Sequence, residues 1–198
     1  MPCPPNSLEH APLLTGARVM LRALQPDDAV ERLRAGRAAE FVWMCGGDPR
    51  HLRPMTPADA QAWYARLADD PLGWAIVAGG RCIGHARLHH VEWADFRARY
   101  AIGIFDKSSW GQGYGTEATR LVLGYAFDRL GLHRVDLRVL EYNTRAIACY
   151  QKCGFVREGL ERESALVAGQ WYSDVIMSIL AQEYRRLAPI WAAEAAAP

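Results

Sequence analysis

The sequence predicts a single α+β domain, a mixed β-sheet with helices on its faces. A run that alternates between apolar and polar residues indicates a strand near the start of the chain. Gly79 and Gly80 separate two further runs of strand type, which is typical of a β-hairpin with a two-residue turn. Segments with a helical period of apolar residues begin near Gly115 and Asn143, each between two predicted strands. At 198 residues, the chain is long enough for one domain with a sizeable core and too short for two ordinary ones.

The first elements are marked by polarity and by helix start signals. Residues 18–24 alternate in polarity, as a half-buried strand does. Asp27 and Asp28 open a helix, because acidic side chains are stabilised at the positive helix N-terminus. Thr56 followed by Pro57 reads as an N-cap and first helical residue. In chain order, the predicted elements are a strand over 18–24, helices over 26–37 and 56–69, strands over 74–78, 81–88 and 100–105, a helix over 115–130, a strand over 135–140, a helix over 143–152, and strands over 156–163 and 171–180.

The later elements are delimited mainly by composition and by glycines. The run over 100–105 is nearly all apolar, which predicts a central strand buried on both faces. Gly131 and Gly154 end the two helices that follow, because glycine accepts the left-handed conformation that closes a helix. Gly169 centres the turn of the last hairpin.

Both ends of the sequence lack periodic structure. We expect a flexible arm over 1–14, one domain over 15–185 and a loose tail over 186–198. The first residues show neither a basic segment nor an apolar stretch, so no secretory signal is predicted. No run approaches the roughly 18 apolar residues of a membrane helix. We therefore expect a cytoplasmic protein without a membrane partner.

Charge and cysteine content exclude several classes of partner. Lys and Arg total 23 against 22 Asp and Glu, so no overall field attracts nucleic acid. The five cysteines form no CxxC pair. Cys149 and Cys153 lie one helical turn apart, but no nearby His completes a zinc site. We expect buried thiols in a reducing compartment and no bound metal.

A glycine-rich loop lies between the predicted central strand and the following helix. Gly111, Gly113 and Gly115 alternate with other residues there, and they leave the backbone N–H groups accessible to a ligand. The helix N-terminus adds unpaired N–H groups and partial positive charge, which suits a pyrophosphate. The spacing matches neither a P-loop nor a dinucleotide fingerprint. A plain glycine-rich turn without a ligand is the alternative.

A second segment follows the next predicted strand. Asn143 is suited to cap the helix that it begins, and Tyr150 lies seven residues on, along the same helix face. A polar pair beside an anion-binding loop is suited to hold an elongated cofactor. The alternative for Tyr150 is an amphipathic core residue with its hydroxyl at the surface.

These segments resemble the GNAT superfamily of acetyl-CoA-dependent N-acetyltransferases, in particular the branch of ribosomal-protein N-terminal acetyltransferases (RimJ/RimL-like). The resemblance covers roughly residues 12–185 and implies a GNAT fold, with a central mixed, mostly antiparallel sheet flanked by helices. It implies acetyl-CoA as co-substrate, and a homodimer is one expected assembly because dimers are common in this branch. It rests on four segments in the family's order: Leu21–Asp28, Trp110–Ala118, Asn143–Phe155 and Gly169–Asp174.

The resemblance also assigns site residues. Backbone amides of the glycine loop would hold the coenzyme A pyrophosphate, and the strand edge at its start would pair with the pantetheine arm. Asn143 would hydrogen-bond near that arm, and Tyr150 would protonate the leaving sulfur. The implied cofactor-binding residues are Ile104, Phe105, Gln112, Gly113, Tyr114, Gly115, Thr116 and Asn143, and the implied catalytic residue is Tyr150.

One departure from the family leaves the general base open. Relatives often carry Glu near the position of Arg99, where it serves as base or holds a water. An α-amine titrates near ~8 and a lysine amine near ~10.4, so a water chain can suffice for an N-terminal substrate. Other candidates for the base are Glu92, Asp95, Asp106, His89 and His90.

The expected reaction is direct attack of a primary amine on acetyl-CoA in a ternary complex. The amine belongs to a protein N-terminus or to a small molecule. The alternatives are another acyl donor such as succinyl-CoA, or a non-catalytic acyl-CoA-binding module. A covalent cysteine route is disfavoured, because no cationic partner or His adjoins Cys149 or Cys153 in sequence. The residues predicted as walls of the acceptor pocket are Trp43, Arg50, Trp63, Trp93 and Trp171.

Overall fold

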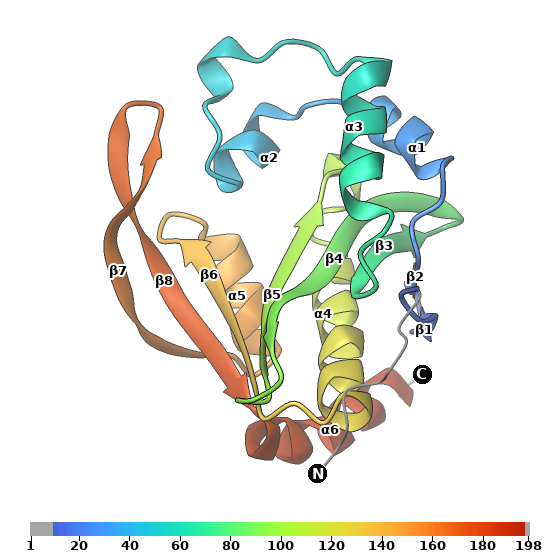
Figure 1. Cartoon of the computed structure of the whole chain (residues 1–198), viewed down its shortest axis with the longest axis vertical. Helices are drawn as coiled ribbons and strands as arrows, with labels where there is room; N and C mark the ends of the chain where they lie inside the picture. Colours follow the sequence, from blue (N-terminus) through green and yellow to red (C-terminus); the bar gives the residue numbers. More distant parts are fainter. Residues whose placement is uncertain (1–9, 197–198) are drawn as a thin grey trace.

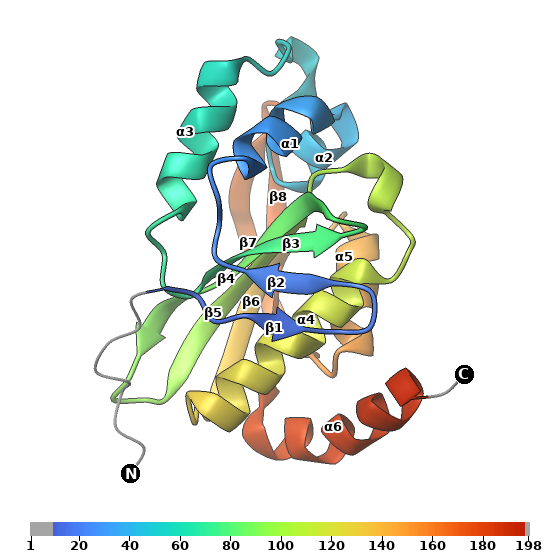
Figure 2. The same cartoon turned by 90° about the vertical axis from the view of Figure 1, so that its right-hand side faces the viewer.

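The computed structural model describes residues 10–196 and confirms the α+β class. Eight strands form one sheet in the order β1-β2-β3-β4-β5-β6-β8-β7, and helices lie on both of its faces (Figures 1 and 2). The strands are β1 (Leu14–Thr15), β2 (Met20–Arg22), β3 (Gly73–Ala78), β4 (Arg81–Glu92), β5 (Arg97–Ile104), β6 (Arg134–Leu140), β7 (Val156–Val167) and β8 (Gln170–Leu180). The α-helices are α1 (Asp28–Ala35), α2 (Ala39–Met44), α3 (Pro57–Leu67), α4 (Tyr114–Gly124), α5 (Thr144–Lys152) and α6 (Ala181–Ala196).

Two hydrophobic clusters hold the helices onto opposite faces of the sheet. The larger cluster joins α4 to β4 and β5, and it includes Val122 and Leu123 together with Leu88 and Tyr100. The smaller one includes Trp63 of α3 beneath the β3–β4 hairpin. Burial on both faces explains why β3 reads as an uninterrupted apolar run rather than as an alternating one.

The sheet opens between its two central strands. All strand pairs are antiparallel except β5 and β6, which run parallel. These two strands pair only from Arg97–Arg134 to Arg99–Asp136 and then diverge, although β5 continues to Ile104. The divergence leaves unpaired backbone edges beside the N-termini of α4 and α5.

The helix boundaries follow their sequence signals closely. Thr56 accepts a hydrogen bond from the Asp59 amide and completes a capping box at the start of α3. Asn143 accepts from the Ala146 amide and caps α5. Below α4, the helix continues as a π-helical turn over Tyr125–Arg129 and ends before Gly131, as predicted.

Three segments differ from the sequence expectations. Helix α2 was not predicted, and it holds a place between α1 and the cavity described below. The segment expected as a loose tail from residue 186 instead continues α6, and Trp191 is buried there beneath the guanidinium of Arg120, 4.9 Å from its ring. The expected flexible arm overlaps strand β1 and the buried residue Ala11, while residues 1–9 lie outside the described part.

Between residues 10 and 196, no helix is long and apolar enough to cross a bilayer.

Candidate active site

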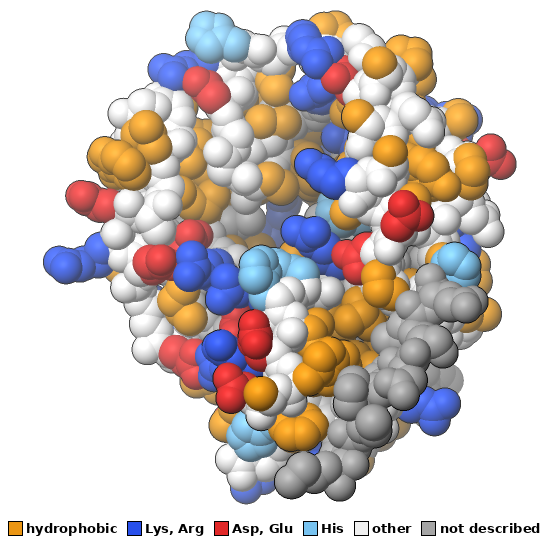
Figure 3. Space-filling view, viewed as in Figure 1, with side chains coloured by type: hydrophobic (Ala, Val, Ile, Leu, Met, Phe, Trp, Pro, Cys, Tyr) orange, Lys and Arg blue, Asp and Glu red, His pale blue; other side chains and the backbone are white. Residues whose placement is uncertain are grey.

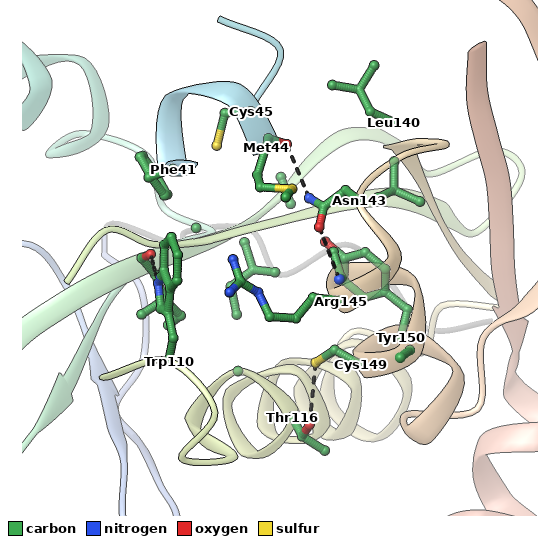
Figure 4. A pocket seen from close by; sticks show the side chains of 18 of the residues that line it. Phe41, Met44, Cys45, Trp110, Thr116, Leu140, Asn143, Arg145, Cys149 and Tyr150 are labelled. Atoms are coloured by element: carbon green, nitrogen blue, oxygen red, sulfur yellow. Dashed lines mark hydrogen bonds between the residues drawn. The ribbon is translucent and has the colours of Figure 1, made fainter. Parts of the chain in front are cut away.

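A cavity of about 720 Å³ fills the opening between β5 and β6 (Figure 4). Its walls come from β5, the glycine loop, the first turn of α4, helix α5, the end of β6 and helix α2. Figure 3 shows a hollow on this side of the molecule, between α3 and β4 on one side and β7 and β8 on the other. Of the nine residues predicted from the sequence, all but Phe105 and Gln112 line the cavity: Ile104, Gly113, Tyr114, Gly115, Thr116, Asn143 and Tyr150.

The edge of β5 presents backbone groups to the cavity. Ile104 of β5 is opposite Gly84 of β4. The hydrogen bond at this point is made by the next residue, because the Phe105 amide donates to the Ile83 carbonyl. Ile104 and Gly84 therefore form a non-hydrogen-bonded pair, and both backbone groups of Ile104 point away from β4. By the same alternation, Ile102 also presents its N–H and C=O to the cavity. Phe105 does not, because its N–H is directed to β4 and its ring is buried beside Trp63.

Trp110 covers one of these groups. Its indole N–H donates to the Ile104 carbonyl over 2.7 Å. The Arg145 guanidinium of α5 lies across the cavity and stacks on the Trp110 ring, 3.9 Å from its centroid (Figure 4). Arg145 also approaches Glu40 of α2 at 3.5 Å. Sequence reasoning missed this bridge between α5 and the loop, because no local pattern links residues 35 positions apart.

The glycine loop turns the chain into α4 without a side-chain cap. Gly113 is the N-cap, with φ at 81°, and an added Cβ would lie 2.9 Å from the Arg18 guanidinium. The first N–H groups of α4, those of Tyr114, Gly115 and Thr116, have no intrahelical acceptor. These N–H groups and the helix dipole are suited to an anion, and the pyrophosphate site expected here remains a prediction. Gln112 instead offers its carbonyl to Arg18, outside the cavity.

Helix α5 adds two cationic side chains to the cavity wall. Arg145 and Lys152 both line the cavity from α5. A formal excess of positive charge on this wall favours a phosphate-bearing ligand.

Asn143 is engaged by the protein itself. Its side-chain oxygen accepts from Ala146, and its amide donates to the Met44 carbonyl over 3.1 Å (Figure 4). The neighbouring Tyr142 hydroxyl donates to Trp43, whose ring stacks on that of Tyr142 at 4.7 Å. Asn143 therefore fixes α2 over the cavity, and its predicted bond to a cofactor remains a prediction.

Tyr150 lies deep in the cavity wall. It is 7% exposed, and its ring packs edge-on against Tyr100 and Phe155. Its hydroxyl has no hydrogen-bond partner among residues 10–196. Burial raises the pKa of Tyr150 well above its ordinary value, and the nearby Cys149 adds to this effect. The phenol is therefore held protonated beside the opening, as a proton donor must be.

The cysteines have separate environments. Cys82 and Cys153 are buried as expected, but Cys45 is exposed and Cys149 is half-buried at the cavity wall. Hydrogen bonds from Cys153 and Thr116 lower the pKa of Cys149. Cys3 lies outside the described residues. Residues 10–196 hold no group of three or more His, Cys, Asp or Glu that could bind a metal.

None of the predicted general bases lines the cavity. Glu92 and Asp95 lie where β4 turns into β5, at the far end of the pair from Ile104. Asp106 accepts from Ser108 and Ser109 instead. Arg99, near whose position the family resemblance implies a Glu, forms an ion pair with Asp136 at 2.7 Å.

The two predicted histidine bases are set apart as well. His89 faces Arg99 across the strand pair, and its ring nitrogen contacts that of His90. Burial, with the charge of Arg87, lowers the pKa of His89 to about 4. One acidic residue that the sequence analysis passed over as a base does line the cavity: Asp174 of β8.

None of the residues predicted as walls of the acceptor pocket lines the cavity. Trp63 packs against Phe105, and Trp43 packs between Tyr142 and Tyr172. Trp93 packs against the larger core, Trp171 is exposed, and Arg50 pairs with Asp48. Helix α2 provides the wall instead, through Phe41, Met44 and Cys45.

His85 of β4 lies next to this wall and should make the fold sensitive to acid. Its Nδ1 is buried without a hydrogen-bond partner in the described part of the chain, and a Cβ on Gly103 would lie 3.4 Å from its ring. Burial, then the charges of Arg87, Arg66 and Arg32, lower its pKa to about 4. In the unfolded chain the His85 imidazole takes up a proton near pH 6.5, whereas in the folded protein it does so only near pH 4. The free energy of unfolding therefore keeps its full value above pH 6.5 and falls as the pH drops toward 4.

At about 1.4 kcal/mol per pKa unit, His85 accounts for a loss of up to ~3 kcal/mol over this range. Urea unfolding at pH 7 and pH 4.5 measures the difference. In His85→Gln the difference should shrink by most of that amount. An unchanged difference would contradict the assignment.

Comparisons with known proteins place the fold and the family. A family model described as an acetyltransferase (GNAT) domain matches residues 18–156. Among solved structures, a GCN5-related N-acetyltransferase from Brucella melitensis superposes with a TM-score of 0.82 over 96% of this chain and 88% of that one, at 22% identity. That likeness shows a shared GNAT fold, whose mixed and mostly antiparallel sheet is the one described above.

Sequence relatives agree with the family match. The Bacillus subtilis protein named "Probable N-acetyltransferase YjcK" is 33% identical over 175 residues, covering 85% of this chain and 97% of that protein. The spermidine N(1)-acetyltransferase of Escherichia coli K12 is 29% identical over 111 residues, covering 56% of this chain and 59% of that protein. Together with the family match over residues 18–156, these similarities show that the chain belongs to the GNAT family of N-acetyltransferases.

Proposed function

We propose that this enzyme transfers an acetyl group from acetyl-CoA to a primary amine, by direct attack in a ternary complex within the cavity between β5 and β6. One observation carries the proposal. A single cavity is lined by the free edge of β5, the uncapped N-terminus of α4 and the buried phenol of Tyr150. These three features supply, in order, partners for an amide-containing chain, a site for phosphate and a proton donor.

The cofactor site follows from the unpaired backbone groups. The N–H groups of Tyr114, Gly115 and Thr116 would hold the pyrophosphate, with Arg145 and Lys152 adding positive charge. The pantetheine amides would pair with the backbone groups of Ile102 and with the N–H of Ile104, as a further strand would, because the Ile104 carbonyl already accepts from Trp110. Acetyl-CoA supplies an activated acetyl thioester at the inner end of this path.

The protein residues then divide the chemistry. A β5 amide directed at the thioester carbonyl stabilises the charge that develops on its oxygen. Tyr150 donates its phenolic proton to the departing sulfur, which prevents re-attack by the thiolate. Helix α2 covers the opposite side of the cavity, and Phe41 and Met44 limit access of water to the reacting groups.

The acceptor is the finer part of the proposal. We infer an N-terminal α-amine or a small-molecule amine, because the site carries no acidic lining beyond Asp174 among residues 10–196. The relative from Escherichia coli is named for spermidine, a polycation. On the wall of this cavity Arg138 and Arg145 pair with Glu161 and Glu40, while Lys152 takes part in no ion pair among the described residues. The charge of Lys152 favours an acceptor with one amine over a polyamine.

Two measurements test the proposal. Acetyl-CoA should raise the melting temperature of the protein more than succinyl-CoA does, because a ligand that binds only the folded state stabilises it by mass action. Thiol release from acetyl-CoA should occur with peptides that bear a free α-amine and should be slow with spermidine. Stabilisation without thiol release from any amine would indicate a binding module, and a preference for succinyl-CoA would reassign the donor.

A further inference from the structure

Asp174 is the single carboxylate on the cavity wall between residues 10 and 196. It lies on β8, where its backbone is opposite Leu140 of β6 and Glu161 of β7. Leu140 lines the same cavity, and so does Ala165 of β7. The carboxylate therefore belongs to the wall that faces β5 and helix α5 across the opening.

A distortion in β7 holds this carboxylate in place. The pairing of β7 with β8 shifts register between Glu161 and Ala165, and Glu163 within the shift has φ at 52°. The shift brings Ser164 against Asp174: the Ser164 hydroxyl donates to Asp174 Oδ2 over 3.0 Å and accepts from the Asp174 amide over 2.9 Å. A strand irregularity that costs backbone energy and orients one side chain is typical of functional sites.

The charge of Asp174 is not neutralised by the groups around it. Arg138 on β6 also lines the cavity, but it pairs with Glu161 at 2.9 Å. Asp174 takes part in no ion pair among the described residues. The other titratable groups near it are Glu161, which lies opposite it on β7, Tyr142 on the loop before α5 and Tyr172 on β8. None of these offers a positive charge, so one carboxylate oxygen remains available to a ligand.

We propose that Asp174 binds the ammonium group of the acceptor and removes its proton before acetyl transfer. This inference rests on the proposed function and names the base that Arg99 leaves missing. Asp174 lies on β8, beside β6, whereas the Glu that the family resemblance implies would lie on β5, near Arg99.

The proton balance is complete with the residues at hand. Asp174 takes one proton from the ammonium, and the free amine lone pair forms the new N–C bond as the C–S bond breaks. Tyr150 gives its proton to the sulfur, and the second amine proton returns to the Tyr150 oxygen through solvent. The proton on Asp174 leaves to water, so each turnover releases one proton, one thiol and one amide.

The substitution Asp174→Asn tests the role, with a short peptide amide bearing a free α-amine as acceptor. At pH 7 we expect kcat/KM to fall by about 100-fold, the usual contribution of a positioned base. The variant can use only the neutral amine, so its kcat/KM should rise with pH until the acceptor titrates near ~8. The ratio of wild-type to variant activity should therefore shrink toward alkaline pH, which a merely structural role would not produce.

Control variants separate this inference from the proposed function. Glu163→Gln removes an exposed carboxylate from the same part of β7 and should keep wild-type activity. Ser164→Ala should lower kcat/KM by a smaller factor, because it loosens Asp174 without removing it. Asp174→Asn should also keep wild-type stabilisation by acetyl-CoA. Two results would overturn the inference and leave the acetyltransferase function standing. One is an Asp174→Asn variant as active as the wild type, and the other is a loss of kcat/KM that is the same at every pH.

Discussion

Tyr150→Phe should lower kcat by 100-fold or more, toward the ~10⁴-fold limit of general acid catalysis. The substitution removes only the hydroxyl, which has no hydrogen-bond partner among residues 10–196, so the ring packing against Tyr100 and Phe155 stays intact. The KM for acetyl-CoA and for the amine should change little. Without the phenolic proton, the thiolate leaves as an anion into a buried site, which is unfavourable. Steady-state thiol release, under conditions where chemistry limits the rate, measures the effect.

Tyr125→Phe is the matched control for this experiment. Tyr125 is a buried core tyrosine that packs against Trp74, and it does not line the cavity. It should retain wild-type kcat. An unchanged kcat in Tyr150→Phe would exclude the acid role and leave protonation of the sulfur to water.

The pH profile offers a second check on the same group. Because burial raises the pKa of Tyr150, its deprotonation should not limit kcat until well above pH 10, the ordinary value of tyrosine. A loss of kcat between pH 8 and 10 that disappears in Tyr150→Phe would contradict this environment.

Local signals predicted the fold because each one acts within a few residues. The Thr56 and Asn143 caps and the Gly79–Gly80 turn all lie where the sequence places them. Helix α2 escaped prediction since its N-cap residue, Ala38, offers no capping oxygen. Contacts from Tyr142 and Asn143, 99 residues away, hold it instead. Tertiary contacts of this kind leave no trace in local composition.

The same distinction applies to the site. The glycine loop and Tyr150 could be predicted because a turn glycine and a helix face are local properties. Asp174 and the Trp110–Arg145 stack could not be placed, because they depend on how β8 and α5 meet β5 across the opening. Phe105 was expected at the cofactor edge but does not line the cavity, and the strand alternation that turns its N–H toward Ile83 depends on pairing with β4.

Gly115→Val should weaken acetyl-CoA binding by at least about 100-fold, which corresponds to ~2.7 kcal/mol. A Cβ at this position would meet only the Cys149 sulfur at 3.7 Å, so the fold has space for it. Valine, however, adds two methyl groups beyond this Cβ, in the same first turn of α4 as the N–H groups of Tyr114 and Thr116. Those groups can hold a pyrophosphate only if its oxygens approach the backbone closely. Isothermal titration with acetyl-CoA measures the loss.

The graded variant Gly115→Ala separates obstruction from misfolding. Alanine stabilises a helix relative to glycine by about 1 kcal/mol, so this variant should melt no lower than the wild type while binding acetyl-CoA with intermediate affinity. Gly113→Ala provides the opposite case. Its φ of 81° strains any side chain, so that variant should lose stability by about 1–2 kcal/mol together with affinity. If Gly115→Val bound acetyl-CoA as tightly as the wild type, the pyrophosphate would have to lie elsewhere, and the α4 N-terminus would not be its site.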